Sequence, residues 1–160
     1  MDAYKDQSAA NCLRLLLLTG SRAGEALEAE WTEFDLQRGV RTKPTHQTKQ
    51  KKEEHLPLIP PAIDLLRSTK PRNASGPLFP GKSGGARVTL RRPWVQACKV
   101  AGLVEENQIE GKLRMLTRHK PTVRIHDLRH IYASHLFSGG AGLQIVGKPP
   151  RHVQESTTMR

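Results

Sequence analysis

The stretch IHDLRHIYASHLFS, residues 125–138, predicts a strong helix that carries candidate functional residues. Gly139 and Gly140 follow directly and are expected to end that helix. At helical spacing, His126 and Arg129 lie on one face. An imidazole and a guanidinium that point the same way suit a single phosphate, because arginine offers bidentate hydrogen bonds to its oxygens.

A metal site is a second interpretation of this helix. His126 and His130 are four residues apart and could bind one ion. A third ligand would be needed, and the sequence has no HExxH motif or cysteine pair to supply it. Cys12 and Cys98 share no short spacing, so neither a zinc site nor a disulfide framework is expected. We expect no metal, and a pair of structural histidines is the other alternative.

A second cationic piece lies near the start of the chain. Thr19 and Gly20 form a turn, after which Ser21 is expected to cap a helix that begins at Arg22. Glu25 lies three residues further on and can hold the arginine by an i,i+3 pair. The alternative is an ordinary helix start with a surface arginine.

A third cationic piece lies between residues 39 and 58, which predict a β-hairpin with a lysine-rich tip. Lys49, Lys51 and Lys52 belong to this tip. A lysine on such a tip can reach a phosphate or a leaving oxygen, whereas the alternative is a charged, solvated turn.

The whole pattern predicts an α+β fold, mainly α, with one small antiparallel sheet or hairpin. Trp31 and Phe34 are expected to anchor the second helix to the core. Besides residues 125–138, helices are expected over residues 6–18, 22–30, 60–67, 89–101 and 142–148, with a loop over 69–87 and a polar segment of little periodicity over 105–124.

The charge distribution points to a polyanionic partner. The chain of 160 residues carries a net charge of +11. Residues 1–40 have a net charge of −3, and residues 41–160 have a net charge of +14. Nucleic acid is favoured because neutralising phosphates releases counterions, and only 4% aromatic residues favours duplex DNA over stacked single strands. A basic surface without a partner, or an RNA-binding protein, would have a similar charge. No apolar run is long enough for a membrane span.

The order of these pieces resembles the catalytic domain of the tyrosine recombinases, the phage integrase family. The resemblance covers nearly the whole chain and rests on LLLLTGSRAGEAL, HLPL, LFP, HDLRHIYAS and the tail VGK…H…STTMR. It implies a catalytic set of Arg22, Lys49, His126, Arg129 and His152, with Glu25 and His130 in support and Lys51, Lys52 and Arg151 on DNA.

The resemblance also implies a chemistry. A tyrosine hydroxyl attacks a DNA phosphate and forms a 3′-phosphotyrosine link, which a 5′-hydroxyl later reverses. Neither ATP nor a metal is required, so no cofactor is expected. The implied partner is duplex DNA, with a homo-oligomer on DNA or an intact recombinase as further partners. A cytoplasmic location, in the bacterial cytosol or nucleoid, is expected.

Two departures from the family pattern shape the expected activity. Pro149-Pro150-Arg151 replaces the usual Leu-Leu-Gly and is expected to displace His152 from the phosphate site. The nucleophilic tyrosine would fall at position 161, one residue beyond Arg160.

We therefore interpret residues 1–160 as a catalytic domain without the tyrosine segment and without the N-terminal core-binding domain. Tyr132 is expected to be a core residue of its helix. The chain is expected to bind DNA weakly and not to cleave it covalently by itself. A non-catalytic DNA-binding remnant is the alternative function, and a metal-dependent nuclease using His126 and His130 is a further one.

Overall fold

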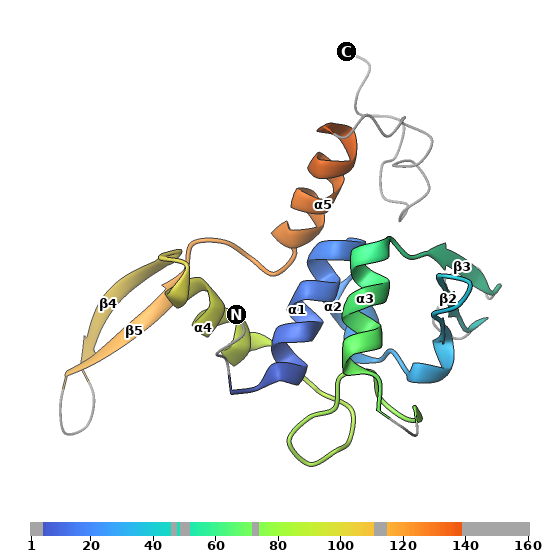
Figure 1. The fold of residues 1–160 in the computed structure, drawn as a ribbon. Helices are drawn as coiled ribbons and strands as arrows, with labels where there is room; N and C mark the ends of the chain where they lie inside the picture. The colour runs from blue at the N-terminus through green and yellow to red at the C-terminus, as the bar shows by residue number, and fades with distance from the viewer. Residues whose placement is uncertain (1–4, 46–47, 49–51, 72–73, 111–114, 139–160) are drawn as a thin grey trace.

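The computed structural model describes residues 5–45, 48, 52–71, 74–110 and 115–138, and Figure 1 shows their arrangement. Its helices are α1 (Gln7–Thr19), α2 (Ala23–Leu27), the 3-10 helix η1 (Trp31–Glu33), α3 (Pro60–Thr69), α4 (Arg91–Val100) and α5 (Asp127–Ser138). Its strands are β1 (Phe34–Asp35), β2 (Val40–Lys43), β3 (Glu54–Pro57), β4 (Val104–Glu110) and β5 (Met115–Pro121). The predicted α+β class, with helices dominating, is confirmed.

Helix α1 forms the centre of the molecule, and α2, α3, α4 and α5 all contact it. Asp6 caps its start, where the side chain accepts a hydrogen bond from the Ala9 amide at 3.0 Å. Gly20 ends it in the left-handed conformation, with φ +62°, as the sequence predicts. The core around α1 comprises Ala9, Cys12, Leu13, Leu15, Leu16, Ala26, Ala29, Trp31, Phe34, Leu36, Ala62, Leu66, Leu78, Phe79 and Leu90.

The predicted hairpin at residues 39–58 is confirmed and gains a third strand. Strands β1, β2 and β3 form an antiparallel sheet in that order, and Thr42 lies opposite His55 across the β2–β3 pair. Strand β2 turns Arg41 and Lys43 toward the interior, because alternate residues of a strand point to the same side. Arg41 is paired there with Glu33 at 2.8 Å, so the interior of this sheet is ionic as well as apolar.

The second predicted helix is shorter than expected. It covers Ala23–Leu27 instead of residues 22–30, and its N-cap is Arg22 instead of Ser21. The chain becomes extended at Glu30, which forms an isolated bridge with Pro77. That bridge ends the helical stretch and lets Trp31 turn into the core, as predicted for this side chain.

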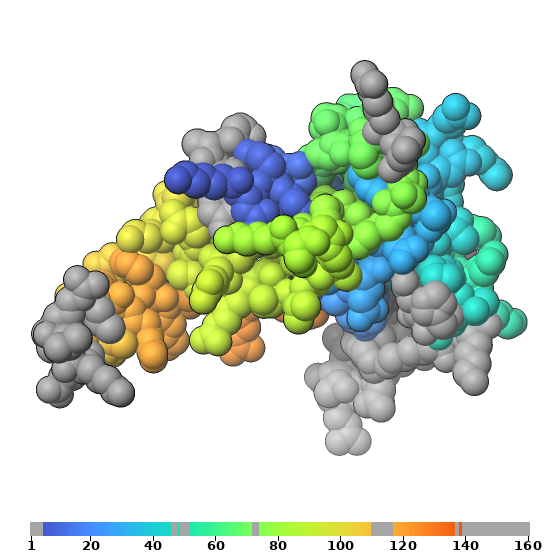
Figure 2. Space-filling view, turned by 90° about the horizontal axis from the view of Figure 1, so that it is seen from below, coloured from blue at the N-terminus to red at the C-terminus, as the bar shows by residue number. Residues whose placement is uncertain are grey.

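The expectation of one small sheet was wrong, because β4 and β5 form a second antiparallel hairpin over most of residues 105–124, for which no strand was predicted. The strands show no apolar alternation: α4 contacts both strands, but most of their described side chains are exposed. Cross-strand polar pairs support the ladder, among them His119–Glu106 at 3.1 Å and Gln108–Thr117 at 3.2 Å. The hairpin projects from the helices at one end of the molecule (Figures 1 and 2).

Two remaining expectations concern the edges of the described chain. The helix predicted over residues 142–148 lies outside the described residues.

Helix α5 begins at Asp127, two residues later than predicted, because the Asp127 carboxylate accepts a hydrogen bond from the Arg124 amide at 2.7 Å and fixes the first turn. None of the described helices is long and apolar enough to cross a membrane.

Candidate phosphate-binding site

The turn after α1 brings Arg129 next to the segment that carries Arg22. Arg129 lies in the first turn of α5, and its Nη1 donates a hydrogen bond to the Gly20 carbonyl at 3.0 Å. Gly20 precedes Arg22 by two residues. The two arginines are separated by more than a hundred residues of sequence, and the contact between α1 and α5 joins their segments at one end of the core.

Arg22 is held at the start of α2 by Glu25. Its amide donates to Oε2 of Glu25 at 3.3 Å, and its Nη1 lies 3.4 Å from Oε1 of the same carboxylate. The i,i+3 pair predicted from the sequence is therefore confirmed. The Arg22 side chain is still 40% exposed, so its guanidinium lies where an anion from solvent can reach it.

Lys43 is a third cation at this site, and the sequence analysis did not identify it. Its Nζ lies 2.9 Å from Oε2 of Glu25 and 3.8 Å from Oε2 of Glu54. Its position in β2 could have indicated it. Arg41 and Lys43 occupy the two alternate positions that a core-facing strand normally fills with apolar residues. Buried cations at such positions need carboxylate partners, which Glu33 and Glu25 supply.

The charges of the site act on each other. Burial raises the pKa of Glu25, but the hydrogen bond and charge of Lys43 and the contacts with Arg22 outweigh it, so the pKa lies below the ordinary value. Burial lowers the pKa of Arg129, the positive charge of Arg22 lowers it further, and Glu25 acts in the opposite direction. Arg22, Glu25 and Arg129 thus form one electrostatic cluster in which two guanidiniums repel each other.

Such a cluster is suited to an anion. A phosphate between two guanidiniums would relieve their repulsion and accept charge-assisted hydrogen bonds from both. Arg22 and Arg129 lie at the same turn, and their role on a phosphate stays a prediction.

His126 and His130 lie beside the cluster and are both exposed. His126 directly precedes α5, and its carbonyl accepts a hydrogen bond from the Arg129 amide at 3.1 Å. The two imidazole rings pack edge to face with centroids 5.4 Å apart. Among the described residues, no group of three His, Cys, Asp or Glu side chains is placed to bind a metal ion.

Tyr132 packs against the same turn. The backbone of Gly20 approaches its ring so closely that a Cβ at position 20 would overlap it. Burial raises the pKa of the Tyr132 hydroxyl. Tyr132 is half-buried and lies outside the core cluster, so it packs on this turn and not in the core as expected.

Lys49, Lys51, Arg151 and His152 lie outside the described residues. Lys52 is described and exposed in the segment between β2 and β3. Its amide donates to Oγ1 of Thr48 at 3.2 Å, and that hydroxyl donates to the Lys52 carbonyl at 2.7 Å.

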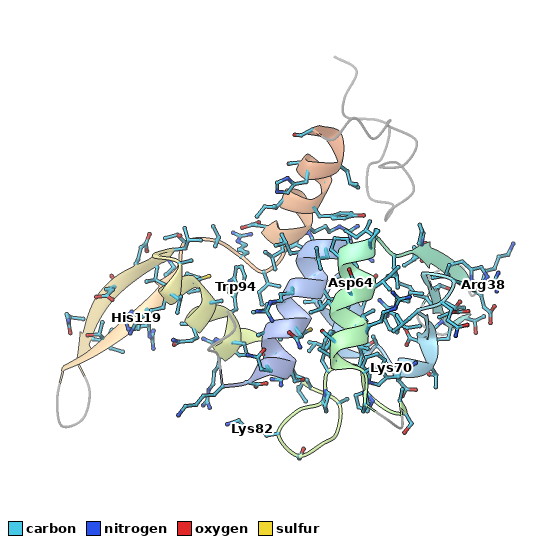
Figure 3. All side chains as sticks on the ribbon, viewed as in Figure 1. Arg38, Asp64, Lys70, Lys82, Trp94 and His119 are labelled. Carbon is cyan, nitrogen blue, oxygen red and sulfur yellow. The ribbon has the colours of Figure 1, made fainter. Side chains whose placement is uncertain are left out.

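A basic groove lies between α2, α4 and β5 and has a volume of about 690 Å³. Trp94 of α4 forms part of its wall and donates from Nε1 to the Val123 carbonyl at 3.1 Å; Figure 3 labels it together with His119 of β5. Four cationic side chains line the groove: Arg91, Arg118, Lys120 and Arg124. Two of these four cations, Arg118 and Lys120, belong to the β4–β5 hairpin, which was not predicted from the sequence.

Comparison with known proteins places this arrangement in a family. The model of the phage integrase family matches residues 1–160. The protein described as "Putative integrase/recombinase y4qK" of Sinorhizobium fredii (strain NBRC 101917 / NGR234) is 31% identical over 141 residues, which cover 87% of this chain and 41% of that protein. The chain thus spans less than half the length of this relative.

Solved structures share the fold. The integrase of mycobacterium phage Brujita has a TM-score of 0.60 at 22% identity, covering 90% of this chain and 43% of that one. The Tn1549 transposon integrase, in complex with a circular intermediate DNA, has a TM-score of 0.60 at 14% identity, covering 91% and 51%. The catalytic domain of bacteriophage HP1 integrase has a TM-score of 0.55 at 21% identity, covering 93% and 73%.

Proposed function

Because the chain belongs to the phage integrase family, we propose that it binds duplex DNA as part of a site-specific recombinase and that Arg22 and Arg129 hold one phosphodiester. In this proposal, residues 1–160 form the catalytic domain of the recombinase, which acts in the bacterial cytosol or nucleoid. The observation that carries it is the hydrogen bond from Arg129 to the Gly20 carbonyl, which brings the second arginine to the turn that presents the first.

The proposed chemistry is phosphoryl transfer by charge neutralisation. The two guanidiniums offset the negative charge that develops on the non-bridging oxygens when a tyrosine oxygen, having given its proton to a general base, attacks the phosphorus. The P–O bond to the 5′-oxygen then breaks, and a general acid supplies the proton to that oxygen. We propose Lys49 for this acid, with His126 as a further phosphate contact, on the family resemblance. His152 would have the same role in the family pattern, but Pro149-Pro150 is expected to displace it here.

Tyr132 is not proposed as the nucleophile. Its ring is packed against Gly20, and the raised pKa of its hydroxyl disfavours the phenolate. We expect a nicked suicide duplex to trap no covalent adduct through Tyr132. A covalent adduct that disappears in the Tyr132→Phe variant would contradict this assignment.

The test of phosphate binding is the affinity for a fluorescently labelled duplex, measured by anisotropy with the 160-residue chain. Arg129→Ala is expected to weaken binding by about 10- to 100-fold, because a hydrogen bond to a charged group contributes about 1.5–3 kcal/mol. It should also reduce the slope of log K against log salt by about 0.9, the value for one lost phosphate contact.

Lys70→Ala is the matched control. Lys70 follows α3 at the end of the molecule opposite to α5 (Figure 3), is exposed, and contributes the same positive charge. It should leave the affinity within about twofold, since a distant exposed charge is screened by salt. Equal losses in the Arg129 and Lys70 variants would mean that only the overall charge attracts DNA, and the proposed site would be wrong.

A further inference from the structure

We infer that Lys43 is a positioning residue, which holds the charge of Glu25 so that the Arg22 guanidinium stays available to a phosphate. The inference rests on the proposed function, because it assigns a role at the same phosphate site. It concerns a residue of β2 outside the set of catalytic and DNA-binding residues expected from the sequence.

The distances at Glu25 show which cation it holds more tightly. Lys43 Nζ lies 2.9 Å from Oε2, whereas Arg22 Nη1 lies 3.4 Å from Oε1. The Lys43 side chain is 9% exposed and the Arg22 side chain is 40% exposed. A buried charge pair is screened less by water than an exposed one. The carboxylate is therefore committed mainly to Lys43, and Arg22 is oriented by it without being fully neutralised.

The second carboxylate near Lys43 does not change this division. Glu54 lies 3.8 Å from Lys43 Nζ and is 48% exposed, so it is the weaker of the two partners. Arg41, two residues earlier in β2, donates from Nη2 to the Glu25 carbonyl at 2.9 Å. The backbone of Glu25 is thus fixed to the strand that carries Lys43, and the pair has little room to separate.

Removal of Lys43 would redirect the Glu25 charge toward the arginines. The groups that face this carboxylate are Arg22 from the start of α2, Lys43 from β2 and Arg129 from α5, with Glu54 of β3 behind Lys43. Three cations around one anion leave a net positive charge for a phosphate. Two cations around the same anion leave less, and the guanidinium of Arg22 would close onto Glu25.

If Lys43 holds the charge of Glu25, the DNA affinity of the Lys43→Met variant should depend on pH. In the native chain, Lys43 contributes to the lowered pKa of Glu25, so the carboxylate stays ionised as the pH falls from 8 to 5. In Lys43→Met, the burial that raises the pKa persists while the largest opposing contribution is lost, so the pKa rises. As the pH falls, Glu25 is therefore protonated earlier in the variant than in the native chain, which releases Arg22 and reduces the deficit in affinity.

The experiment compares DNA affinity at pH 8 and pH 5 for Lys43→Met, Lys43→Arg and the double variant Lys43→Met/Glu25→Gln. At pH 8, Lys43→Met should bind the labelled duplex about tenfold more weakly than the native chain, the loss that corresponds to one charged hydrogen bond. The deficit relative to the native chain should shrink at pH 5. Lys43→Arg keeps the charge and should stay within about threefold of native affinity, or half a power of ten.

The double variant separates positioning from folding. It lacks Lys43 but also lacks the anion that would capture Arg22, so its affinity should return toward the native value at pH 8. A purely structural role for Lys43 would leave the double variant as weak as Lys43→Met. If Lys43→Met does not fold by circular dichroism, Lys43→Gln removes the same charge from a side chain that keeps a hydrogen-bond donor, and the same comparison applies.

Three outcomes would overturn the inference: native affinity in Lys43→Met, a deficit that is independent of pH, or a double variant that is not rescued. The ¹³C titration of the Glu25 carboxyl gives an independent readout without DNA. Its midpoint should rise in Lys43→Met, and an unchanged midpoint would also overturn the inference. Loss of affinity in Arg129→Ala without loss in Lys43→Met defeats the inference alone, whereas no loss in either defeats the proposed function as well.

Discussion

Gly20 is the residue at which helix geometry and the candidate site meet. Its φ of +62° ends α1, its carbonyl accepts the Arg129 guanidinium, and its α-carbon lies against the Tyr132 ring. A side chain at position 20 would disfavour both the backbone conformation and the Tyr132 contact. The left-handed region is strained for residues with a Cβ, and the ring leaves no space for one. The position thus requires glycine for packing as well as for backbone conformation.

Gly20→Ala is expected to destabilise the fold by more than backbone strain alone. Strain in the left-handed region costs about 1–2 kcal/mol, and overlap with Tyr132 adds a packing cost of about 1–3 kcal/mol. The free energy of unfolding in urea measures the sum.

Gly102→Ala provides the matched control, because Gly102 follows α4 with φ +70° and has open space where a Cβ would lie. It should show the strain cost alone. Equal destabilisation in the two variants would mean that α5 moves away from Gly20 without penalty, and the contact between Tyr132 and Gly20 would contribute nothing.

The sequence predicted the Arg22–Glu25 pair of the site but not its Lys43–Glu25 pair. Arg22 and Glu25 could be identified because their i,i+3 spacing is local. Lys43 was missed, since its contact with Glu25 joins β2 to α2 and its alternation with Arg41 along β2 was the sole sequence signal. Spacing within one element is written in the sequence, whereas a pairing between two elements follows only from their packing.

The elements differ in what holds them in place. Helix α1 buries most of its side chains in the core, while the β4–β5 hairpin relies on its backbone ladder and on exposed polar pairs such as Lys120–Glu105 at 3.8 Å. Exposed pairs of this kind contribute little to stability. The hairpin should therefore open locally without unfolding of the core.

Hydrogen exchange measured by mass spectrometry tests this difference. Backbone amides of β4 and β5 are expected to exchange well before those of α1, because their opening does not require global unfolding. Leu66→Ala, a fully buried change in α3 that should cost about 2–5 kcal/mol, should speed exchange in α1 and leave the hairpin rate unchanged. Acceleration of both elements by this variant would show that the hairpin belongs to the cooperative core.

The same difference explains which elements could be predicted. The apolar run that ends α1 marks a buried helix, and Gly20 marks its end. Residues 104–121 carry no alternation of apolar and polar residues, because α4 covers the hairpin only in part and most of its described side chains are exposed. Periodicity reports burial, so a strand pair without a buried side gives no signal of this kind.

Across the part of the molecule that the structure describes, ion pairs connect segments that lie far apart in the sequence. Arg87, between α3 and α4, donates from Nη2 to Asp6 at 2.8 Å and to the Pro80 carbonyl at 3.1 Å. The Lys43–Glu25 pair connects the three-stranded sheet to α2. These contacts tie the start of α1 and the candidate site to the rest of the chain, and both depend on ionised carboxylates.

Acid should therefore weaken the fold through these pairs. Burial raises the pKa of Asp6, but the hydrogen bond and charge of Arg87 and the Ala9 amide lower it below the ordinary value of 3.8. A carboxylate with a lowered folded-state pKa stabilises the fold above its unfolded-state pKa, and that stabilisation is lost as the pH falls through the folded value. The same holds for Glu25, whose ordinary value is 4.5. The melting temperature should begin to fall in this acidic range because of both groups.

Asp6→Asn isolates one of these contributions, because asparagine is as good an N-cap as aspartate and keeps the start of α1 intact. The variant should melt at a lower temperature than the native chain at pH 7, and the two curves should converge as the pH falls below 3.8. Asp64→Asn, a change at an exposed carboxylate of α3 labelled in Figure 3, serves as the control and should show no such convergence. A constant difference between Asp6→Asn and the native chain at every pH would mean that the charge of Asp6 plays no part, and that the Arg87 contact stabilises the fold only as a neutral hydrogen bond.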